Sequence, residues 1–328
     1  MNRKILLGTL AAILLAAACL PFLRSQQQTR TQFLMDTVVS ITAPRSAKAA
    51  VDDCFAELAR LDGMLSAYRA DSEVSRVNVG ASAAPVAVSD ELFALLSRAQ
   101  DISAQTDGAF DVTIKPLIDV WDIRSGKNVV PNAAQIAAAR DQVGYRHMAL
   151  DADAKTVQFT KPGMQIELGG IAKGYAGDRV REILQTAGVR GAIADLGGNI
   201  VTLPSKSGKP YRIGLQDPSR PRGSYFTTVE PAGGSVVTSG PYERQFVVDG
   251  TVYHHILDPA TGYPARTGLQ SVTVLSDDGT LADALSTALF VLGADKGAEL
   301  ARQLGVQAIF LTDENQMIQV DDIGAIAP

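Results

Sequence analysis

Alternating apolar and polar residues predict strands along much of this chain, and apolar residues spaced three to four apart predict helices between them. Residues 33–41 form the first alternating stretch and are rich in β-branched side chains. Gly197 and Gly198 interrupt another such stretch and predict a turn there. The further strands expected on these grounds are 164–166, 192–200, 211–215, 226–229, 235–238, 246–257, 270–275 and 306–311, with a hairpin over 148–159.

Helical spacing predicts helices over 46–65 and 90–105, with Ser46 and Ser89 as their N-caps. Further helices are expected shortly after Pro131 and over 175–187, 281–292 and 298–304. The stretches without such spacing are expected as a polar loop over 65–78 and an irregular apolar segment over 108–121. Strands and helices mix without a regular β-α-β alternation, so we expect an α+β fold with a mixed, largely antiparallel sheet packed with helices.

Composition sets only broad limits. The 328 residues are 46% apolar and 20% charged, which is ordinary for a globular protein and enough for one large domain or two modest ones. The net charge of −5 is mild and argues against nucleic acid as the main partner. No linker marks a boundary, so we treat residues 33–328 as one domain that could be divided into two lobes.

The first 24 residues have the pattern of a secretory signal or a membrane anchor. A short basic segment precedes an apolar run over 5–19. Small residues before Cys19 are similar to a lipoprotein processing site, and the alternative is an uncleaved helix through Leu23. Either interpretation predicts an exported, tethered protein, with 25–32 as a linker between the anchor and the domain.

Residues 167–179, with the sequence ELGGIAKGYAGDR, predict a glycine turn between a strand and a helix. Gly169 and Gly170 would let backbone amides approach a ligand closely. Lys173 falls in the first turn of the helix, where its charge opposes the helix dipole, so an anion in front of it is expected. The alternatives are a phosphate site and a turn needed only for packing. The spacing matches neither a dinucleotide fingerprint nor a P-loop.

His254 and His255 are candidates for proton transfer. Neighbours in a strand point to opposite faces, so at most one of them faces a shared site. Histidine titrates near neutrality and commonly accepts a proton from a weak nucleophile. The alternative is a pair of structural histidines at a strand end.

Asp283 and Thr287 lie four residues apart on a predicted helix, so their oxygens project from one face. A carboxylate with a hydroxyl suits Mg²⁺, although an Asp near a helix N-terminus also serves as a cap. Asp195, next to the turn at Gly197 and Gly198, is a further ligand candidate or part of a tight connection.

Taken together and in this order, these motifs resemble those of the ApbE family. The pieces that carry the resemblance are Met35-Asp36-Thr37, LSAY at 65–68, Ser72 to Asn78, FDVT at 110–113, Pro116-Leu117 with Trp121, ELGGIAKGYAGD, ADLGGN, HHILDPATGYP and DALST. They span roughly residues 33–320. The resemblance implies an ApbE-like core related to the T-fold, with an FAD site between two lobes if the domain is divided.

The resemblance also implies an activity. Members of this family are FAD:protein FMN transferases, which move FMN from FAD to a threonine hydroxyl of an acceptor flavoprotein and release AMP. Their acceptors carry a motif around Ser/Thr-Gly-Ala-Thr and include subunits of membrane redox complexes. The implied location is the inner membrane, facing the periplasm or extracytoplasmic side, with FAD as substrate and Mg²⁺ as cofactor.

The family's site residues map onto this chain one by one. His255 maps to the proposed base, and Asp283 is both catalytic and a metal ligand. The implied magnesium ligands are Gly170 (through its carbonyl), Asp283 and Thr287. The positions implied to line FAD are Met35, Lys173, Asp195, Gly197, Gly198 and Thr261.

Two other functions remain open from the sequence. An FAD pyrophosphatase on the same scaffold would give FMN and AMP, with water in place of the acceptor threonine. A lipoprotein that binds FAD without chemistry is the alternative from another class.

Overall fold

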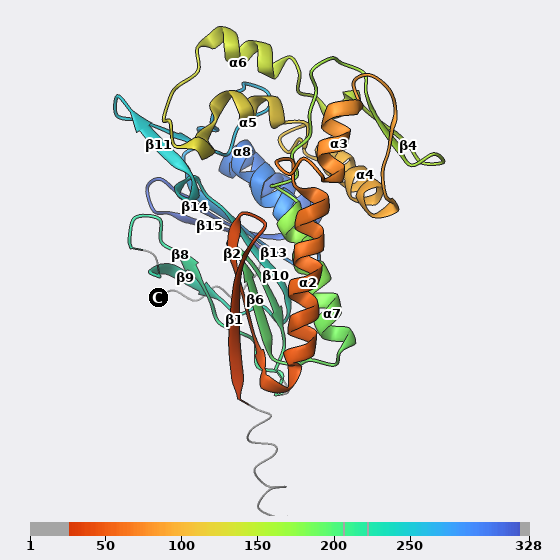
Figure 1. Cartoon of the computed structure of the whole chain (residues 1–328). Coiled ribbons are helices and arrows are strands. Elements are labelled where there is room, and N and C mark those ends of the chain that lie inside the picture. Colours follow the sequence, from red (N-terminus) through yellow and green to blue (C-terminus); the bar gives the residue numbers. More distant parts are fainter. Residues whose placement is uncertain (1–25, 206, 222, 322–328) are drawn as a thin grey trace, which may run out of the picture.

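Eight strands form one antiparallel sheet in the computed structural model (Figure 1), which describes residues 26–205, 207–221 and 223–321. Every neighbouring pair in this sheet is antiparallel. In spatial order the strands are β1 (Gln27–Leu34), β2 (Thr37–Pro44), β6 (Ala192–Leu196), β7 (Asn199–Leu203), β10 (Gly234–Ser239), β13 (Leu269–Ser276), β14 (Gln307–Thr312) and β15 (Met317–Val320). The α+β prediction is confirmed.

Helices α7 (Ala172–Thr186) and α8 (Gly279–Leu304) cover one face of this sheet, and α2 (Lys48–Leu65) packs beside α7. Apolar residues at helical spacing explain the packing of α7, since Ala176, Val180 and Leu184 are fully buried. Burial of such faces against the sheet forms the main core.

The opposite face is partly covered by a hairpin of β8 (Ile213–Gln216) and β9 (Tyr225–Val229). Its apolar residues pack on Val236, Leu275 and Ile309 of the central sheet and form a second core.

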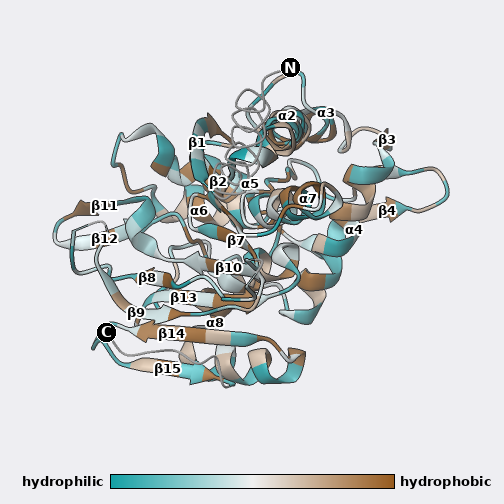
Figure 2. Cartoon of the chain, turned by 90° about the horizontal axis from the view of Figure 1, so that it is seen from below, coloured by the Kyte–Doolittle hydropathy of each residue, from teal (hydrophilic) through white to brown (hydrophobic). Residues whose placement is uncertain are grey.

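The remaining elements gather at one end of the central sheet, above it in Figure 1. They are α3 (Glu73–Gly80), α4 (Asp90–Gln105), α5 (Lys115–Trp121), α6 (Ala133–Arg140), the sheet of β3 (Val86–Ala87), β5 (Thr156–Phe159) and β4 (Met148–Asp151), the hairpin of β11 (Gln245–Val248) and β12 (Thr251–His254), and 3-10 turns at Ile123–Ser125, Tyr145–His147 and Pro241–Glu243. One more 3-10 turn, Arg45–Ala47, links β2 to α2 at the other end of the sheet. A third core joins α5, α6 and β11 around Trp121, whose Nε1 donates to the carbonyl of Gly262 at 2.8 Å. Figure 2 shows brown, apolar stretches running through the helices and through the strands of the central sheet.

Several local predictions are confirmed. Ser89 caps α4, since its hydroxyl accepts the Leu92 amide at 3.2 Å. A short helix follows Pro131, residues 148–159 form a hairpin, and Gly197 and Gly198 form the β6–β7 turn.

The expectation of a single strand over 33–41 is wrong. Met35 and Asp36 turn the chain between β1 and β2, and both have positive φ, 52° and 61°. Two left-handed residues suit the twist of a tight hairpin, but non-glycine residues give little sign of it in a sequence. Residues 27–32, expected in a linker, belong to β1, because their backbone pairs with β2 at the edge of the sheet. Polar side chains are common on such edges.

Other boundaries also differ from expectation. Residues 73–80, most of them expected in a loop, form α3, which Ser72 caps by accepting the Ser75 amide at 2.9 Å. The segment expected to be irregular contains α5, with Pro116 in its first turn, where the missing amide costs nothing. Residues 164–166 form no strand, and only one bridge, between Gln165 and Ile114, is present.

The two helices expected over 281–292 and 298–304 are confirmed: they lie end to end within α8 and are divided at Gly293, whose φ of 81° is non-helical. Other expectations near the end of the chain and at Ser46 are corrected. Residues 246–257 form the β11–β12 hairpin, and β15 was not expected. Ser46 does not cap α2, whose N-cap, Ala47, makes no side-chain hydrogen bond.

The predicted signal or anchor over residues 1–24 lies outside the described residues. Of the helices that are described, none has the length and apolar character needed to cross a membrane. Cys54 is fully buried in the main core as a free thiol, and burial raises its pKa to about 12.

Candidate active site

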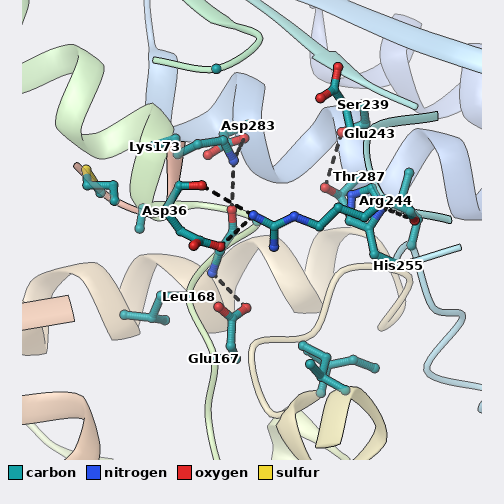
Figure 3. Close-up of a pocket in the computed structure, with 18 of the residues that line it drawn as sticks. Asp36, Glu167, Leu168, Lys173, Ser239, Glu243, Arg244, His255, Asp283 and Thr287 are labelled. Atoms are coloured by element: carbon teal, nitrogen blue, oxygen red, sulfur yellow. Dashed lines mark hydrogen bonds and ion pairs between the residues drawn. The ribbon is translucent and has the colours of Figure 1, made fainter. Parts of the chain in front are cut away.

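A cavity of ≈450 Å³ opens where the central sheet meets the elements above it. It is lined by parts of the chain far apart in sequence: the β1–β2 turn, α5, the glycine turn before α7, the β6–β7 turn, the end of β10, the segment after β12, and α8. Figure 3 shows the charged side chains that converge on it. The convergence makes this cavity the candidate active site.

Lys173 and Asp283 join two neighbouring helices at the floor of the cavity. Lys173 Nζ lies 3.7 Å from Asp283 Oδ1 and donates to the carbonyl of Gly169 at 3.0 Å. The other oxygen of Asp283 accepts the amide of Gly174 at 2.8 Å. The helices can approach this closely because a Cβ on Gly174 would lie 2.1 Å from the carbonyl oxygen of Gly279. Within the protein, the buried carboxylate of Asp283 is the anion that lies beside Lys173.

Thr287 lies one turn beyond Asp283 on α8, and both line the cavity, which confirms that they share a helical face. Its Oγ1 is 3.4 Å from Ser239 Oγ (Figure 3). A Cβ on Gly170 would lie 3.5 Å from the same Oγ1, so the glycine turn lies directly against the hydroxyl. A carboxylate, a hydroxyl and a backbone turn thus meet within a small space.

This donor set fits Mg²⁺. In the described part of the chain, no group of three or more His, Cys, Asp and Glu side chains is placed to hold a metal ion. Mg²⁺ commonly binds one or two carboxylates and leaves its other positions to water and phosphate oxygens. Asp283 and Thr287, with a carbonyl from the turn at Gly170, could supply such hard oxygen ligands.

His255 faces the cavity and His254 faces away from it, as the strand geometry predicts. His255 Nδ1 lies 3.2 Å from the carbonyl oxygen of Arg244. Donation from Nδ1 to that carbonyl leaves Nε2 as the acceptor nitrogen of a neutral ring. His254 is buried, with Nε2 2.9 Å from the carbonyl of Ala265 and its ring edge-to-face with Phe290.

Among the residues that line the cavity, His255 and Glu167 have shifted pKa values that bear on its chemistry. The surrounding protein disfavours the charged ring and lowers the pKa of His255 to about 4, with Arg244 and Lys173 adding repulsion. The side chain itself is open to solvent in the cavity. At neutral pH the ring of His255 is therefore uncharged and can accept a proton.

Burial raises the pKa of Glu167, whose carboxylate accepts the Gly169 amide at 2.8 Å and so fixes the glycine turn.

Four side chains form a charged cluster at the mouth of the cavity, called here the rim cluster: Asp36, Tyr68, Arg124 and Arg244. Asp36 Oδ2 lies 2.6 Å from Arg244 Nη2 and 3.1 Å from Arg124 Nη2. Arg124 also lies over the Tyr68 ring, 4.1 Å from its centroid. Figure 3 shows Arg244 reaching across toward Asp36. The two arginines were not expected at the site, because no local motif marks them.

Most of the predicted site residues line the cavity: Met35, Gly170, Lys173, Gly197, Gly198, His255, Asp283 and Thr287. Asp195 and Thr261 are not among its lining residues. Asp195 accepts the amides of Gly197 and Gly198 at 2.9 and 3.2 Å, so it holds the β6–β7 turn. Thr261 donates to Asp258 at 2.9 Å in an exposed turn. Their contact with a ligand stays a prediction.

Solved structures share this architecture. The ApbE protein of Thermotoga maritima superposes with a TM-score of 0.83 at 34% identity, over 90% of this chain and 97% of that one. The apo flavinyl transferase ApbE of Pseudomonas stutzeri gives a TM-score of 0.79 at 32% identity, over 90% and 95%. The fold is therefore that of the ApbE class.

The chain belongs to the ApbE family, whose sequence profile matches residues 35–310. Among its curated relatives, an FAD:protein FMN transferase of Treponema pallidum is 35% identical over 95% of this chain and 92% of its own length. Another protein of that name, from Klebsiella pneumoniae, is 38% identical over 87% and 89%. The resemblance drawn from the motifs is confirmed.

Proposed function

We propose that this chain is an FAD:protein FMN transferase that moves FMN from FAD onto a threonine hydroxyl of an acceptor flavoprotein and releases AMP. The observation that carries the proposal is the meeting of Lys173, His255, Asp283 and Thr287 in one cavity. They come from α7, the segment after β12, and α8, in a chain whose relatives are named FAD:protein FMN transferases.

His255 is the proposed general base. A threonine hydroxyl is a weak nucleophile and needs a positioned acceptor for its proton. The threonine Oγ forms a bond to the FMN-side phosphorus, and the bond from that phosphorus to the bridging oxygen breaks. The electron pair leaves with AMP, and the hydroxyl proton goes to Nε2 of His255. This nitrogen is free because Nδ1 lies against the Arg244 carbonyl.

Lys173 and the proposed magnesium ligands around Asp283 would offset the negative charge of the FAD diphosphate. Mg²⁺ held by Asp283, Thr287 and the carbonyl of Gly170 would offset charge on the phosphate oxygens when it is bound. Lys173 places a second positive charge beside the same carboxylate. Met35, Gly197 and Gly198 line the cavity where the flavin nucleotide would lie.

FAD hydrolysis is the second candidate activity, and one observation favours it. The His255 side chain is exposed to solvent in the cavity, so water could take the place of the acceptor hydroxyl. FAD storage alone would not require a neutral histidine, His255, in the same cavity as Lys173 and Asp283.

The proposed setting follows from the N-terminal sequence. Residues 1–24 would export the chain and anchor it to the inner membrane through a lipid on Cys19 or an uncleaved helix. Its partners would then be extracytoplasmic acceptor subunits of membrane redox complexes that carry Ser/Thr-Gly-Ala-Thr.

Mass spectrometry tests the function directly. The soluble part of the chain is incubated with FAD, Mg²⁺ and an acceptor domain bearing Ser-Gly-Ala-Thr, with an EDTA sample as the control. We expect a metal-dependent mass increase of one FMN on the threonine. Free FMN and AMP without an adduct would assign hydrolysis instead, and intact FAD throughout would leave only binding.

A further inference from the structure

Two β-hairpins meet at the mouth of the cavity and carry exposed apolar residues in direct cross-strand pairs. On the β1–β2 hairpin, Phe33 pairs with Val38, and these residues are 69% and 59% exposed. On the β11–β12 hairpin, Val247 pairs with Val252, and these are 59% and 43% exposed. Residues paired in this way lie on one face of their hairpin. We call these four residues the hairpin patch.

Both hairpins are joined to the active site. The β1–β2 turn contributes Asp36, which binds Arg244 across the mouth. Arg244 directly precedes β11, and His255 directly follows β12, where its backbone amide donates to the Arg244 carbonyl at 3.1 Å. The β11–β12 hairpin thus begins and ends on the cavity wall, and in Figure 1 it extends outward from there.

The β11–β12 hairpin is held firmly from its inner side. Phe246 is buried and stacks on Tyr253 at 5.4 Å, and Tyr253 lies 5.5 Å from Trp121. No other strand of the described residues pairs with β11 or β12. Its outer end therefore presents valine side chains and free strand edges, and Figure 2 shows the end of β11 in brown. Single exposed apolar residues are ordinary, but paired ones beside a catalytic cavity favour a binding surface.

We propose that the hairpin patch docks the acceptor flavoprotein, which rests on the proposed transferase function. The acceptor must bring a hydroxyl to His255, so its chain has to pass the wall from which the β11–β12 hairpin arises. A lipid surface is the less suitable occupant. The tip of that hairpin is Asp249–Gly250, and an acidic tip opposes binding to anionic lipid, for which Lys and Arg are typical.

The test compares V247S/V252S and F33S/V38S with M317S. Met317 is 43% exposed on β15, at the opposite edge of the central sheet, so it serves as the matched control. The probes are a flavin-acceptor domain bearing Ser-Gly-Ala-Thr and a short peptide of the same motif. If a serine pair lowers the melting temperature, V247T/V252T keeps the strand preference while removing apolar surface.

For each patch variant we expect a roughly tenfold higher KM for the acceptor domain and a similar loss of affinity in calorimetry. FAD affinity and the rate with the short peptide should be unchanged, and M317S should behave as wild type. Wild-type affinity of V247S/V252S for the acceptor domain would overturn the docking proposal. The proposal would also be overturned if the patch variants lost only their binding to lipid vesicles, or only dissociated from a dimer, while acceptor binding stayed unchanged.

The two proposals fail separately. If the wild-type chain binds the acceptor domain through the patch but forms no FMN adduct, docking stands and the transferase proposal fails. If the adduct forms at the same KM in wild type and both patch variants, the transferase stands and docking fails. A wild-type chain that does not bind the domain at all also overturns docking.

Discussion

The floor and the mouth of the cavity are both built on charge, but they are held in different ways. At the floor, the Asp283 side chain is 4% exposed and bonds to a backbone amide of the adjoining helix. At the mouth, the Asp36 side chain is 43% exposed and bonds only to the side chains of Arg124 and Arg244. Exposed ion pairs contribute about 0–1 kcal/mol each, whereas an orphaned buried partner costs more. The floor is therefore fixed by the fold, and the rim cluster can open and close at little cost.

The floor should be the most sensitive place to change. Asp283→Ala removes a proposed metal ligand and the acceptor of the Gly174 amide, so transfer should fall by about 10³-fold or more. Titration with Mg²⁺ should no longer raise the remaining rate. The free energy of unfolding should also fall, by about 1–3 kcal/mol, because a buried amide loses its partner.

Asp283→Asn separates these two effects. Its side-chain oxygen can still accept the Gly174 amide, so denaturation should stay close to wild type while activity is lost. A full response to Mg²⁺ in Asp283→Ala would contradict the metal assignment.

His255→Ala should lower transfer by at least about 10²-fold and leave FAD affinity intact. The reason is that the ring supplies a proton acceptor at the cavity wall and makes no contact that holds the floor. Equilibrium binding of FAD and single-turnover transfer are the two measurements. Unchanged transfer would remove the base assignment.

The pH dependence of transfer also tests His255 as the base. The lowered pKa keeps His255 neutral in the folded state through the range where an ordinary histidine gains a proton. Transfer that depends on the neutral ring should therefore hold from neutral pH to about pH 5 and fall as the pH approaches about 4. A midpoint near 6.5 instead would show that the ring is freely solvated during turnover.

Gly174→Ala tests how tightly the floor is packed. The new Cβ would meet the Gly279 carbonyl at 2.1 Å, so α7 and α8 would have to move apart. The free energy of unfolding should fall by about 1–3 kcal/mol. Gly63→Ala is the matched control in α2, where nothing lies within 4 Å of the added Cβ, and it should stabilise by about 0.5–1 kcal/mol. Equal melting temperatures for the two variants would contradict the packing argument.

Asp36→Asn should have only a small effect on stability. It removes the charge between Arg124 and Arg244, and the free energy of unfolding should change by less than about 1 kcal/mol. The KM for FAD should change a few-fold, with a weaker dependence on salt than in wild type. Asp107→Asn, at another exposed pair, with Arg146, is the control and should leave KM unchanged. A large loss of stability would show that the mouth is as fixed as the floor.

The same contrast explains what the sequence could predict. Asp283 and Thr287 lie on one helix, and Lys173 follows a glycine turn, so local spacing was enough to propose them. Arg124 and Arg244 reach the site only because distant segments fold together, and neither lies in a motif.

The errors in the secondary structure have a similar origin. The turn at Met35 and Asp36 divides one apolar run into two strands, with no glycine to mark it. Strand β1 is polar and gains its structure from pairing with β2, which no local pattern reveals. Elements with a strong local period, such as α4 and α7, were placed correctly to within a few residues.

Strand β1 also sets a length scale. It runs from Gln27, just after the proposed anchor, to Leu34, next to the turn that lines the cavity. Eight residues of extended chain cover about 26 Å. If an uncleaved helix through Leu23 tethers the chain to a bilayer, three residues separate that helix from Gln27, whereas a lipid on Cys19 would leave seven. With the shorter tether, the strand would act as a spacer that sets the height of the catalytic cavity above the lipid, and it would select acceptors whose threonine is presented at that height.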